Sequence, residues 1–271
     1  MTGLGVLRGV IQHVGAELSA HEAIAAEQER WGSIQQLAAE YETIAASAQR
    51  DRWASLIRAS GLTSEQSAAA IESDAFGPLT AELRRAEAHH HNVDSLLTAV
   101  VRALDFADAD DIAAVLISRL TRSTARAQRA GLGRRTPRLI AGLIPEALGS
   151  MSDEMRRALH ERRDLIERRA DWLVSQDVRA NAAWLNELGS PSSTEVDAVW
   201  RRHARVVAAY RDRYGVTGRH ALGAEPGSTS QREDARRARA AIYAARREAR
   251  GSDFDAGRRK RAAAGRSAPS R

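Results

Sequence analysis

The chain has 271 residues, and all of its 41 basic residues except Lys260 are arginine. Lys260 lies within the basic run Arg258–Arg261. The sequence therefore has no P-loop, which needs a lysine after a glycine-rich loop, and no desolvated lysine for Schiff-base chemistry. The absence of cysteine excludes thiol nucleophiles, disulfides and thiolate zinc sites.

The composition favours an all-α fold. Aromatic residues make up 4% of the chain, and alanine dominates the 43% that is hydrophobic. Such a composition suits closely packed helices better than sheets, in which β-branched and aromatic side chains are preferred. No stretch approaches the roughly 20 apolar residues that a membrane span needs. We therefore expect an irregular multi-helix bundle in a soluble, cytoplasmic protein with no membrane partner.

Capping signals divide the first half of the chain into helices. A serine or threonine that is followed three residues later by Glu or Gln forms a capping box, which satisfies the free amides of a helix start. Glycine commonly ends a helix, and proline is tolerated in its first turn. The expected helices are a long one after Ser19–Glu22 with a kink at Gly32 and an end at Gly61, a short one from Thr63, and others over Pro78–His90, 93–105 and 109–128.

The second half has two strong helical patterns. Ser152 is expected to cap a helix that runs to about Val178. The cleanest amphipathic pattern is Thr194–Tyr214, in which apolar residues recur every three or four positions. We expect its histidine, His203, to be a core residue and not a ligand. The side chains expected on its buried face are Val196, Val199, Trp200, His203, Val206, Val207, Tyr210 and Tyr214, and those expected to face largely away are Arg201, Arg202, Arg205 and Arg211.

The connecting stretches suggest how the chain is divided. Residues 131–145 lack helical character until Leu139 and are interpreted as a connector between two helical units. A Gly/Pro/Ser-rich stretch at Gly218–Ser230 is interpreted as a linker. The expected parts are an N-terminal helical subdomain over 1–130, a second helical subdomain over 131–222, and a C-terminal region over 223–271 that comprises a linker, a marginal helix and a disordered basic tail.

The C-terminal region carries the positive charge. Residues 228–271 hold 13 basic and five acidic residues, whereas the remaining 227 residues hold 28 basic and 30 acidic ones. A helix is expected from Ser230 to about Arg250, with a narrow alanine seam that buries little, so that the helix is marginal until a partner binds. Residues 251–271 are expected to be disordered.

Basic arms of this kind contact nucleic acid or another polyanion. The alternative is that the tail is merely solvated and binds nothing, and that its many arginines result from a codon usage rich in G and C. Under the first interpretation DNA is bound through its phosphate backbone, and the candidate contacts are Arg232, Arg236, Arg239, Arg246, Arg250, Arg258, Arg259, Lys260 and Arg261.

Two groups of residues resemble metal sites. Consecutive histidines on a helix, as in His89–His91, point about 100° apart and do not converge on one ion unless the helix ends there. Asp108, Asp110 and Asp111 are interpreted as a helix start, which favours acidic side chains. We therefore predict no catalytic, cofactor-binding or metal-ligating residues, and no enzyme activity.

Several short segments of the sequence are distinctive. They are Arg50–Trp53, Asp74–Leu79, Leu83–Ala88, Asp108–Ala113, Pro137–Pro145 and Val207–Val216. Together they resemble the C-terminal region of the TraA-like conjugative relaxase-helicases of the MobF class from actinobacterial plasmids. The resemblance runs from about Gly15 to Gly223 of this chain and continues weakly into the tail.

The resemblance implies an accessory role in plasmid transfer. In that family a relaxase part nicks DNA with a tyrosine and a three-histidine metal site, and a helicase part unwinds it with ATP. Neither Tyr41 nor His89–His91 has the strand context of the relaxase site, and the helicase lysine is missing, so no catalytic residue is carried over. The implied function is a non-catalytic module that contacts DNA or transfer proteins such as the relaxase, the helicase or the coupling protein. The alternative is a structural or protein-binding domain, or a relaxase remnant, with no nucleic-acid role.

Overall fold

The computed structural model describes residues 32–103, 105–106, 108–129, 135–190 and 194–266. The fold is all-α: in this part of the chain the only strands form a hairpin of two short, antiparallel segments. The described elements are α3 (Ile34–Arg58), α4 (Ser64–Glu72), α5 (Phe76–Ala88), α6 (Val93–Arg102), α7 (Ile112–Arg129), β1 (Leu139–Ile140), β2 (Ile144–Pro145), α8 (Asp153–Arg179), the 3-10 helix η1 (Ala183–Leu188), α9 (Thr194–Arg213) and α10 (Thr229–Arg266).

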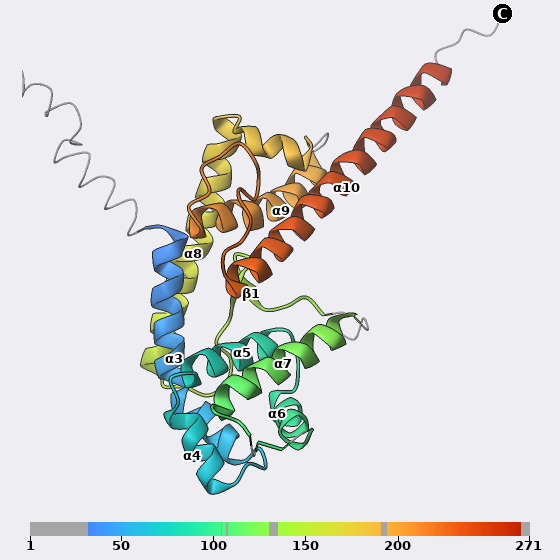
Figure 1. Ribbon diagram of the computed structural model, residues 1–271. Helices are drawn as coiled ribbons and strands as arrows, with labels where there is room; N and C mark the ends of the chain where they lie inside the picture. The colour runs from blue at the N-terminus through green and yellow to red at the C-terminus, as the bar shows by residue number, and fades with distance from the viewer. Residues whose placement is uncertain (1–31, 104, 107, 130–134, 191–193, 267–271) are drawn as a thin grey trace, which may run out of the picture.

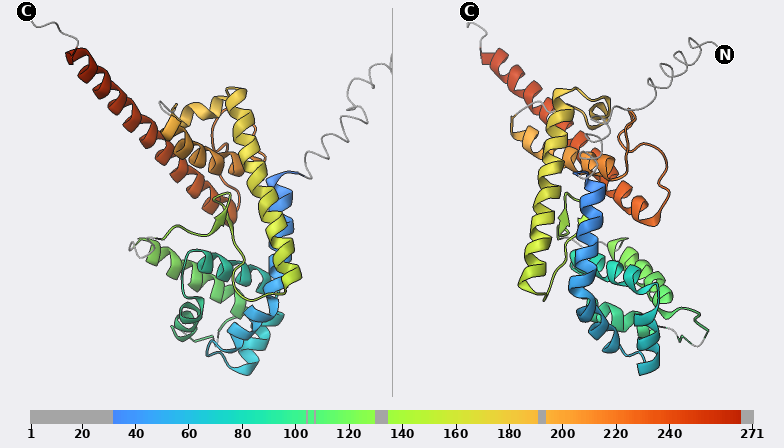
Figure 2. Two further views of the ribbon diagram at one scale, coloured as in Figure 1. Left: turned by 180° about the vertical axis from the view of Figure 1, so that it is seen from behind. Right: turned by 90° about the vertical axis from the view of Figure 1, so that its left-hand side faces the viewer.

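The helices gather at two ends of the molecule. Helices α4 to α7 form one end, and α8, α9 and the first part of α10 form the other (Figure 1). The long helices α3 and α8 lie side by side and connect the two ends (Figures 1 and 2). Helix α10 begins near the middle of the molecule, crosses α9 and continues beyond the body (Figure 1).

The buried side chains form two hydrophobic clusters, and α3 belongs to both. Trp53 and Ile57, near its C-terminal end, pack in a cluster with α4, α5, α6 and α7, here called the α4–α7 cluster. Ile34 and Tyr41, near its N-terminal end, pack in a cluster with the hairpin, α8, η1, α9 and α10, here called the α8–α10 cluster. The described structure thus divides within α3, whereas the sequence suggested a division between residues 130 and 131.

The capping signals locate several helix ends. Thr63 Oγ1 accepts from the Gln66 amide at 3.1 Å, and Gln66 Oε1 accepts from the Thr63 amide at 3.1 Å, which completes the expected capping box. Ser152 caps α8 as expected, with its hydroxyl accepting from the Met155 amide at 3.2 Å. Ser33 caps α3, so this helix begins directly after the glycine at which a kink was expected, and the helix expected before Gly32 lies outside the described residues. The capping box at Ser19–Glu22 lies outside the described residues.

The expected connector contains a buried hairpin. Ile140, Leu143 and Ile144 are fully buried in the α8–α10 cluster, so the segment packs as core. The turn between β1 and β2 places Gly142 at a φ of +75°, where a Cβ atom would lie 2.6 Å from Cγ2 of Val206 on α9. Any other residue here would have to displace the Val206 side chain and adopt a backbone conformation that L residues rarely take.

Helix α9 buries the face that the sequence predicted at its centre. Trp200 is 4% exposed and donates its indole N–H to the Gly189 carbonyl at 2.8 Å. The prediction that its arginines largely face solvent is wrong for two of them. Arg205 forms ion pairs with Glu167 and Asp171 on α8. Arg211 donates to the carbonyl oxygens of three residues after α9, Gly218, His220 and Ala221.

These contacts change the interpretation of the segment between α9 and α10. Arg211 holds it through three carbonyl groups, at 2.8 Å from Gly218, 2.6 Å from His220 and 3.3 Å from Ala221. The Ala221 side chain is fully buried, and its amide donates to Glu187 Oε1 at 3.1 Å. The segment expected to be a linker is therefore packed against the body.

The last helix packs more closely against the body than its expected marginal character suggested. The first half of α10 is part of the α8–α10 cluster, because its alanine seam packs against α9 and η1. The helix begins at Thr229, one residue earlier than expected, and is capped by Ser228, whose hydroxyl accepts from the Gln231 amide at 3.1 Å. It continues to Arg266, through most of the segment expected to be disordered. The buried hydrophobic residues of α10 are Ala235, Ala238, Ala241, Ile242, Ala245 and Ala249.

A buried carboxylate fixes the start of α10. The Asp234 side chain is 3% exposed and lies 3.3 Å from Arg213 and 3.2 Å from Arg237. It also accepts from the Tyr214 hydroxyl at 2.8 Å. Burial raises the pKa of Asp234, and Arg213 is the leading opposing influence. A buried charge of this kind needs its partners, so Asp234 links α10 firmly to the end of α9.

Candidate nucleic-acid interface

One side of α10 carries a row of arginines around an exposed tyrosine. Arg232, Arg236, Arg239, Tyr243 and Arg247 recur at spacings of three and four residues, which places them on one face of the helix. We call these five residues the outer face of α10. The buried alanine seam lies on a different side of the helix, because at about 100° per residue its positions point away from these five.

The side chains of the outer face extend into solvent. Tyr243 is 63% exposed, and the Arg247 side chain is 82% exposed. Arg232, Arg236 and Arg239 are also exposed. Arg232 donates to Thr229 Oγ1 at 2.8 Å, and Arg236 binds both carboxylate oxygens of Glu233 at 2.9 and 2.7 Å, so both contacts stay within α10. The exposed guanidinium groups of Arg232 and Arg239 are thus presented on a rigid helix.

The structure divides the nine candidate residues into three groups. Arg232, Arg236 and Arg239 belong to the outer face. Arg246 does not, because its Nε donates to the Glu187 carbonyl and its guanidinium lies against η1. The side chains of the remaining five lie outside the described part, although their backbone continues α10. These five are Arg250, Arg258, Arg259, Lys260 and Arg261.

The sequence interpretation missed two residues of the outer face, Tyr243 and Arg247. The signal was available, since Tyr243 follows Arg239 by four residues and Arg247 follows Tyr243 by four. The neighbouring arginines Arg246 and Arg247 differ by one helical step of about 100°, which directs the first to η1 and the second to solvent.

The three consecutive histidines have different partners, although His89 and His91 line the same cavity. His89 Nε2 accepts from Arg237 at 2.9 Å, and burial, followed by the charge of Arg237, lowers the pKa of His89 to about 4. His90 has a positive φ of 64° and contacts the Thr136 carbonyl at 2.8 Å. His91 lines a cavity beside α7. Among the described residues, no three His, Asp or Glu side chains form a group suited to a metal ion.

The aspartates before α7 include a helix cap, as expected. Asp111 Oδ1 accepts from the Ala114 amide at 3.2 Å, and Oδ2 accepts from the Ser73 hydroxyl at 2.8 Å. These hydrogen bonds lower the pKa of Asp111, with the Ser73 bond as the larger cause. Asp111 thus fixes the start of α7 against the end of α4.

The phrases that carry the family resemblance make structural contacts. Arg52 donates to Glu87 Oε2 at 3.0 Å and to the Leu148 carbonyl at 2.9 Å, which joins α3, α5 and the segment after β2. The rings of Tyr210 and Tyr214 lie with their centroids 4.9 Å apart. Arg52 thus links three elements of the structure.

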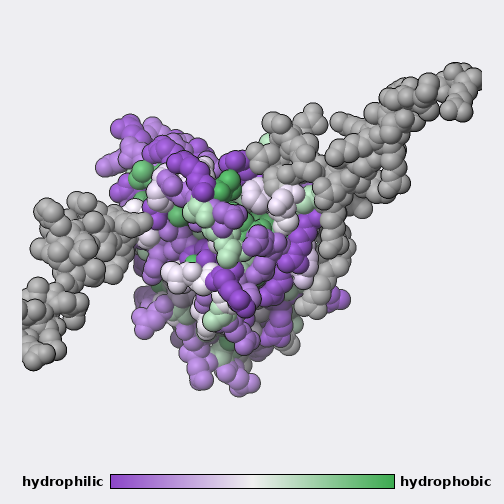
Figure 3. All heavy atoms as spheres, turned by 90° about the horizontal axis from the view of Figure 1, so that it is seen from above, coloured by the Kyte–Doolittle hydropathy of each residue, from purple (hydrophilic) through white to green (hydrophobic). Residues whose placement is uncertain are grey.

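One face of the molecule is mainly hydrophilic. Figure 3 shows polar residues over most of one face, with apolar residues in small patches among them. Within the described residues, no helix combines the length and apolar composition that a membrane crossing requires. Comparisons of this chain with protein-family models, curated proteins and solved structures found no match.

Proposed function

We propose that the outer face of α10 binds nucleic acid without sequence preference. The observation that carries this proposal is the row of exposed arginines on both sides of Tyr243. Arginine binds phosphate oxygens with a planar fork of donors. An exposed aromatic ring between such groups offers a base a surface on which to stack, an arrangement suited to single strands.

The resemblance to the C-terminal region of conjugative relaxase-helicases supplies a biological setting for this activity. We propose a non-catalytic accessory module of a plasmid conjugation system, which acts in the cytoplasm and holds the transferred strand near other transfer proteins. The rigid attachment of α10 to the body through Asp234 and the alanine seam supports this role, because a strand held by the outer face would have a defined position relative to the rest of the protein.

The test compares two triple variants with the same change in charge. Arg232, Arg239 and Arg247 are replaced by Gln in one, and the exposed α8 residues Arg157, Arg168 and Arg179 in the other. For about five phosphate contacts, the logarithm of affinity falls with the logarithm of salt at a slope near −4.5 for duplex and −3.5 for single-stranded DNA. The α10 variant should reduce the duplex slope by about 2.7 in magnitude. The α8 variant should leave it nearly unchanged.

Equal losses in the two triple variants would contradict the proposal, because they would show a response to net charge and not to the outer face. A third variant, Tyr243→Ala, tests stacking. It should weaken binding of single-stranded DNA by about 1–3 kcal/mol and leave duplex binding nearly unchanged. Removing residues 251–271 measures the contribution of the distal basic run, and it spares the buried seam.

A second candidate function is binding of another transfer protein. It is favoured by two exposed apolar residues of α8, Leu165 at 36% and Trp172 at 44% exposure. They are seven residues apart and so lie on one face of the helix. Because such a contact carries little net charge, its affinity should respond weakly to salt. Binding of a relaxase, helicase or coupling protein that is lost in Trp172→Ser and insensitive to salt would support this second function.

A further inference from the structure

The stretch from Ile112 to Pro145 contains no acidic residue. Asp111 precedes it and Glu146 follows it, and it comprises α7, the connector and the hairpin. We call it the acid-free stretch. The near-neutral total of residues 1–227 hides its charge, because acidic residues elsewhere in the body balance it. Its basic residues are Arg119, Arg122, Arg126, Arg129, Arg134, Arg135 and Arg138.

Three arginines of the acid-free stretch have no partner that neutralises them. Arg126, Arg135 and Arg138 are exposed, and within the described structure no hydrogen bond or ion pair holds their side chains. Arg122 is also exposed and donates to the Ser118 hydroxyl at 2.9 Å, which leaves its charge in place. Exposed guanidinium groups of this kind offer their fork of donors to phosphate oxygens.

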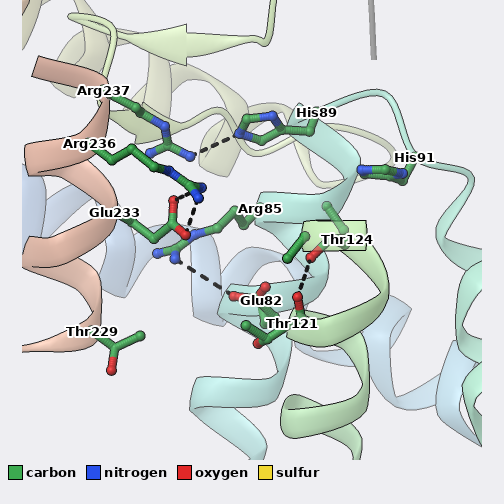
Figure 4. Close-up of a pocket in the computed structure, with 12 residues that line it drawn as sticks. Glu82, Arg85, His89, His91, Thr121, Thr124, Thr229, Glu233, Arg236 and Arg237 are labelled. Carbon is green, nitrogen blue, oxygen red and sulfur yellow. Dashed lines mark hydrogen bonds and ion pairs between the residues drawn. The ribbon is translucent and has the colours of Figure 1, made fainter. Parts of the chain in front are cut away.

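The second half of α7 lies beside the start of α10. A cavity of about 60 Å³ separates them, and Figure 4 shows the side chains that line it, which include Arg85 of α5, Thr121 of α7 and Glu233 of α10. Inside this cavity each arginine has a carboxylate partner, so the cavity itself has no excess of positive charge. The pairs are Arg85 with Glu82 at 3.8 Å, Arg236 with Glu233 at 2.7 Å, and Arg237 with Asp234 at 3.2 Å.

The excess of positive charge lies outside the cavity. Arg122 and Arg126 directly follow Thr121 and Ala125, two residues that line the cavity. One helical step of about 100° turns both arginines from the cavity to the exposed surface of α7. On α10, Arg232 precedes Glu233 by one step and is exposed in the same way. Unpaired arginines of two helices therefore lie on the surface around the junction of α7 and α10.

The described part of the connector runs between these two helices (Figures 1 and 2). The Arg138 amide donates to the Ala88 carbonyl, at the end of α5, at 2.9 Å. From the other side, Arg237 of α10 donates to the Leu143 carbonyl at 3.0 Å. The connector is thus fixed between α5 and α10, and it holds Arg135 and Arg138 next to the start of α10.

We propose that α7, the connector and α10 form one continuous surface for a single strand of nucleic acid, which contacts Arg126, Arg135 and Arg138 as well as the outer face of α10. This inference rests on the function proposed above and adds the second part of the site. Positive groups that gather without carboxylates repel one another, and a polyanion relieves this repulsion. A single strand can follow charges on three segments, whereas a duplex is stiff over the length of a small protein.

The first experiment uses the whole chain and an oligothymidylate of about 16 nucleotides, the upper end of common site sizes for single strands. Arg126, Arg135 and Arg138 are replaced together by Gln, and the matched control is the α8 triple variant described above. Each lost contact to a single strand removes about 0.7 from the salt slope, so the new variant should reduce the slope by about 2.1 in magnitude. The α8 variant should leave it nearly unchanged. Equal slopes in the two variants overturn the proposal.

The triple variant of the outer face separates failure of this inference from failure of the proposed function. Loss of affinity in both the α10 variant and the new variant supports one joint surface. Loss in the α10 variant alone overturns the inference and leaves the proposed function in place. Loss in the new variant alone overturns the proposed function and assigns the strand to the acid-free stretch.

The number of bound strands tests whether the surface is continuous. Titration of the protein with the same oligothymidylate should saturate at one strand per chain, because a single strand occupies both parts of the site. Saturation at two strands per chain, with one of them lost in the new triple variant, overturns the proposal, since it would show two separate sites.

A direct measurement locates the strand without changing any arginine. The chain contains no cysteine, so a single introduced cysteine carries a photo-crosslinker at a chosen position. Thr136 is exposed between Arg135 and Arg138, and Ser55 is exposed near the C-terminal end of α3. The oligothymidylate should be captured from Thr136→Cys and not from Ser55→Cys. Equal capture from the two positions, or none from Thr136→Cys, overturns the proposal.

Discussion

Helices α8 and α10 are both long and rich in arginine, but their arginines have different partners. On α8, Arg162 Nε donates to Glu40 on α3 at 2.6 Å, Arg163 lies 3.7 Å from Glu146 beyond β2, and Arg169 binds Asp212 on α9 at 3.0 Å. On the outer face of α10, Arg232 and Arg236 contact residues of α10 itself.

This difference separates two uses of the same residue type. An arginine whose partner lies on another helix fixes the distance between the helices, and its charge is neutralised there. An arginine whose partner is an uncharged group one turn away, as Thr229 is for Arg232, keeps its positive charge at the helix surface. The number of arginines in a helix therefore says little about its function, and the location of their partners says much more.

The sharpest way to test the attachment of α10 is to remove the buried carboxylate at its start. Asp234→Ala leaves Arg213 and Arg237 without their shared partner, and both are largely buried. Removing one partner of a buried ion pair lowers the free energy of unfolding by about 3–5 kcal/mol. Urea unfolding measures the loss, and Glu248→Ala serves as control, because its pair with Arg247 is exposed and contributes about 0–1 kcal/mol. Similar losses in the two variants would show that α10 is not anchored through Asp234.

A smaller loss of stability is expected when the ion pair between α8 and α9 is broken. Arg169 and Asp212 have side chains that are 16% and 14% exposed, and Asp212 Oδ2 also accepts from the Ile34 amide at 2.7 Å. Arg169→Ala should reduce the free energy of unfolding by about 1.5–3 kcal/mol, the usual range for hydrogen bonds to charged groups. The exposed Arg157→Ala on the same helix should change it by less than about 0.5 kcal/mol. If Arg157→Ala costs as much, the cross-helix partner has no special role.

The pH dependence of stability tests the junction between α10 and α5. The pKa of His89 is lowered to about 4 by burial and then by Arg237, whereas an unfolded histidine has a pKa of about 6.5. The unfolded state therefore binds more protons between these values, so this histidine makes stability fall as the pH falls from about 6.5 to 4. His89→Gln should show a smaller fall over this window in thermal unfolding. Parallel curves for the two proteins would mean that His89 is not buried against Arg237.

The smallest effect on stability is expected on the outer face of α10. Arg239 is exposed, so Arg239→Ala should change the free energy of unfolding by less than about 0.5 kcal/mol. Its effect on DNA affinity should be larger, because each phosphate contact contributes about 0.9 to the salt slope on duplex DNA. A substantial loss of stability in this variant would place Arg239 with the paired arginines of α8.

The parts of the fold that depend on neighbouring residues could be predicted from the sequence. The capping box at Thr63 and the cap at Ser152 involve residues three positions apart, so local pattern located both helix starts. The core face of α9 around Trp200 followed from helical periodicity alone. Such features need no knowledge of the rest of the chain.

The parts that depend on distant residues could not be predicted in this way. An alanine seam buries little surface per residue, and only the fit of α9 against it shows that α10 is part of the core. The partners of Arg205, on α8, and the cavity beside Arg85 join segments separated by tens of residues. The outer face of α10 was found in part, because helical spacing predicts which residues share a face but not which of them meets η1, as Arg246 does.

The hairpin glycine offers a means of finding relatives of this chain. Gly142 combines a positive φ with a backbone approach to Val206 that leaves no room for a Cβ atom. Any substitution would push α9 away from the hairpin or strain the turn, whatever the chemistry of the new side chain. Proteins that share this packing should therefore keep glycine here, after an apolar pair such as Leu139–Ile140 and before another such as Leu143–Ile144. This short pattern is a criterion for recognising the fold in sequences too divergent for ordinary alignment.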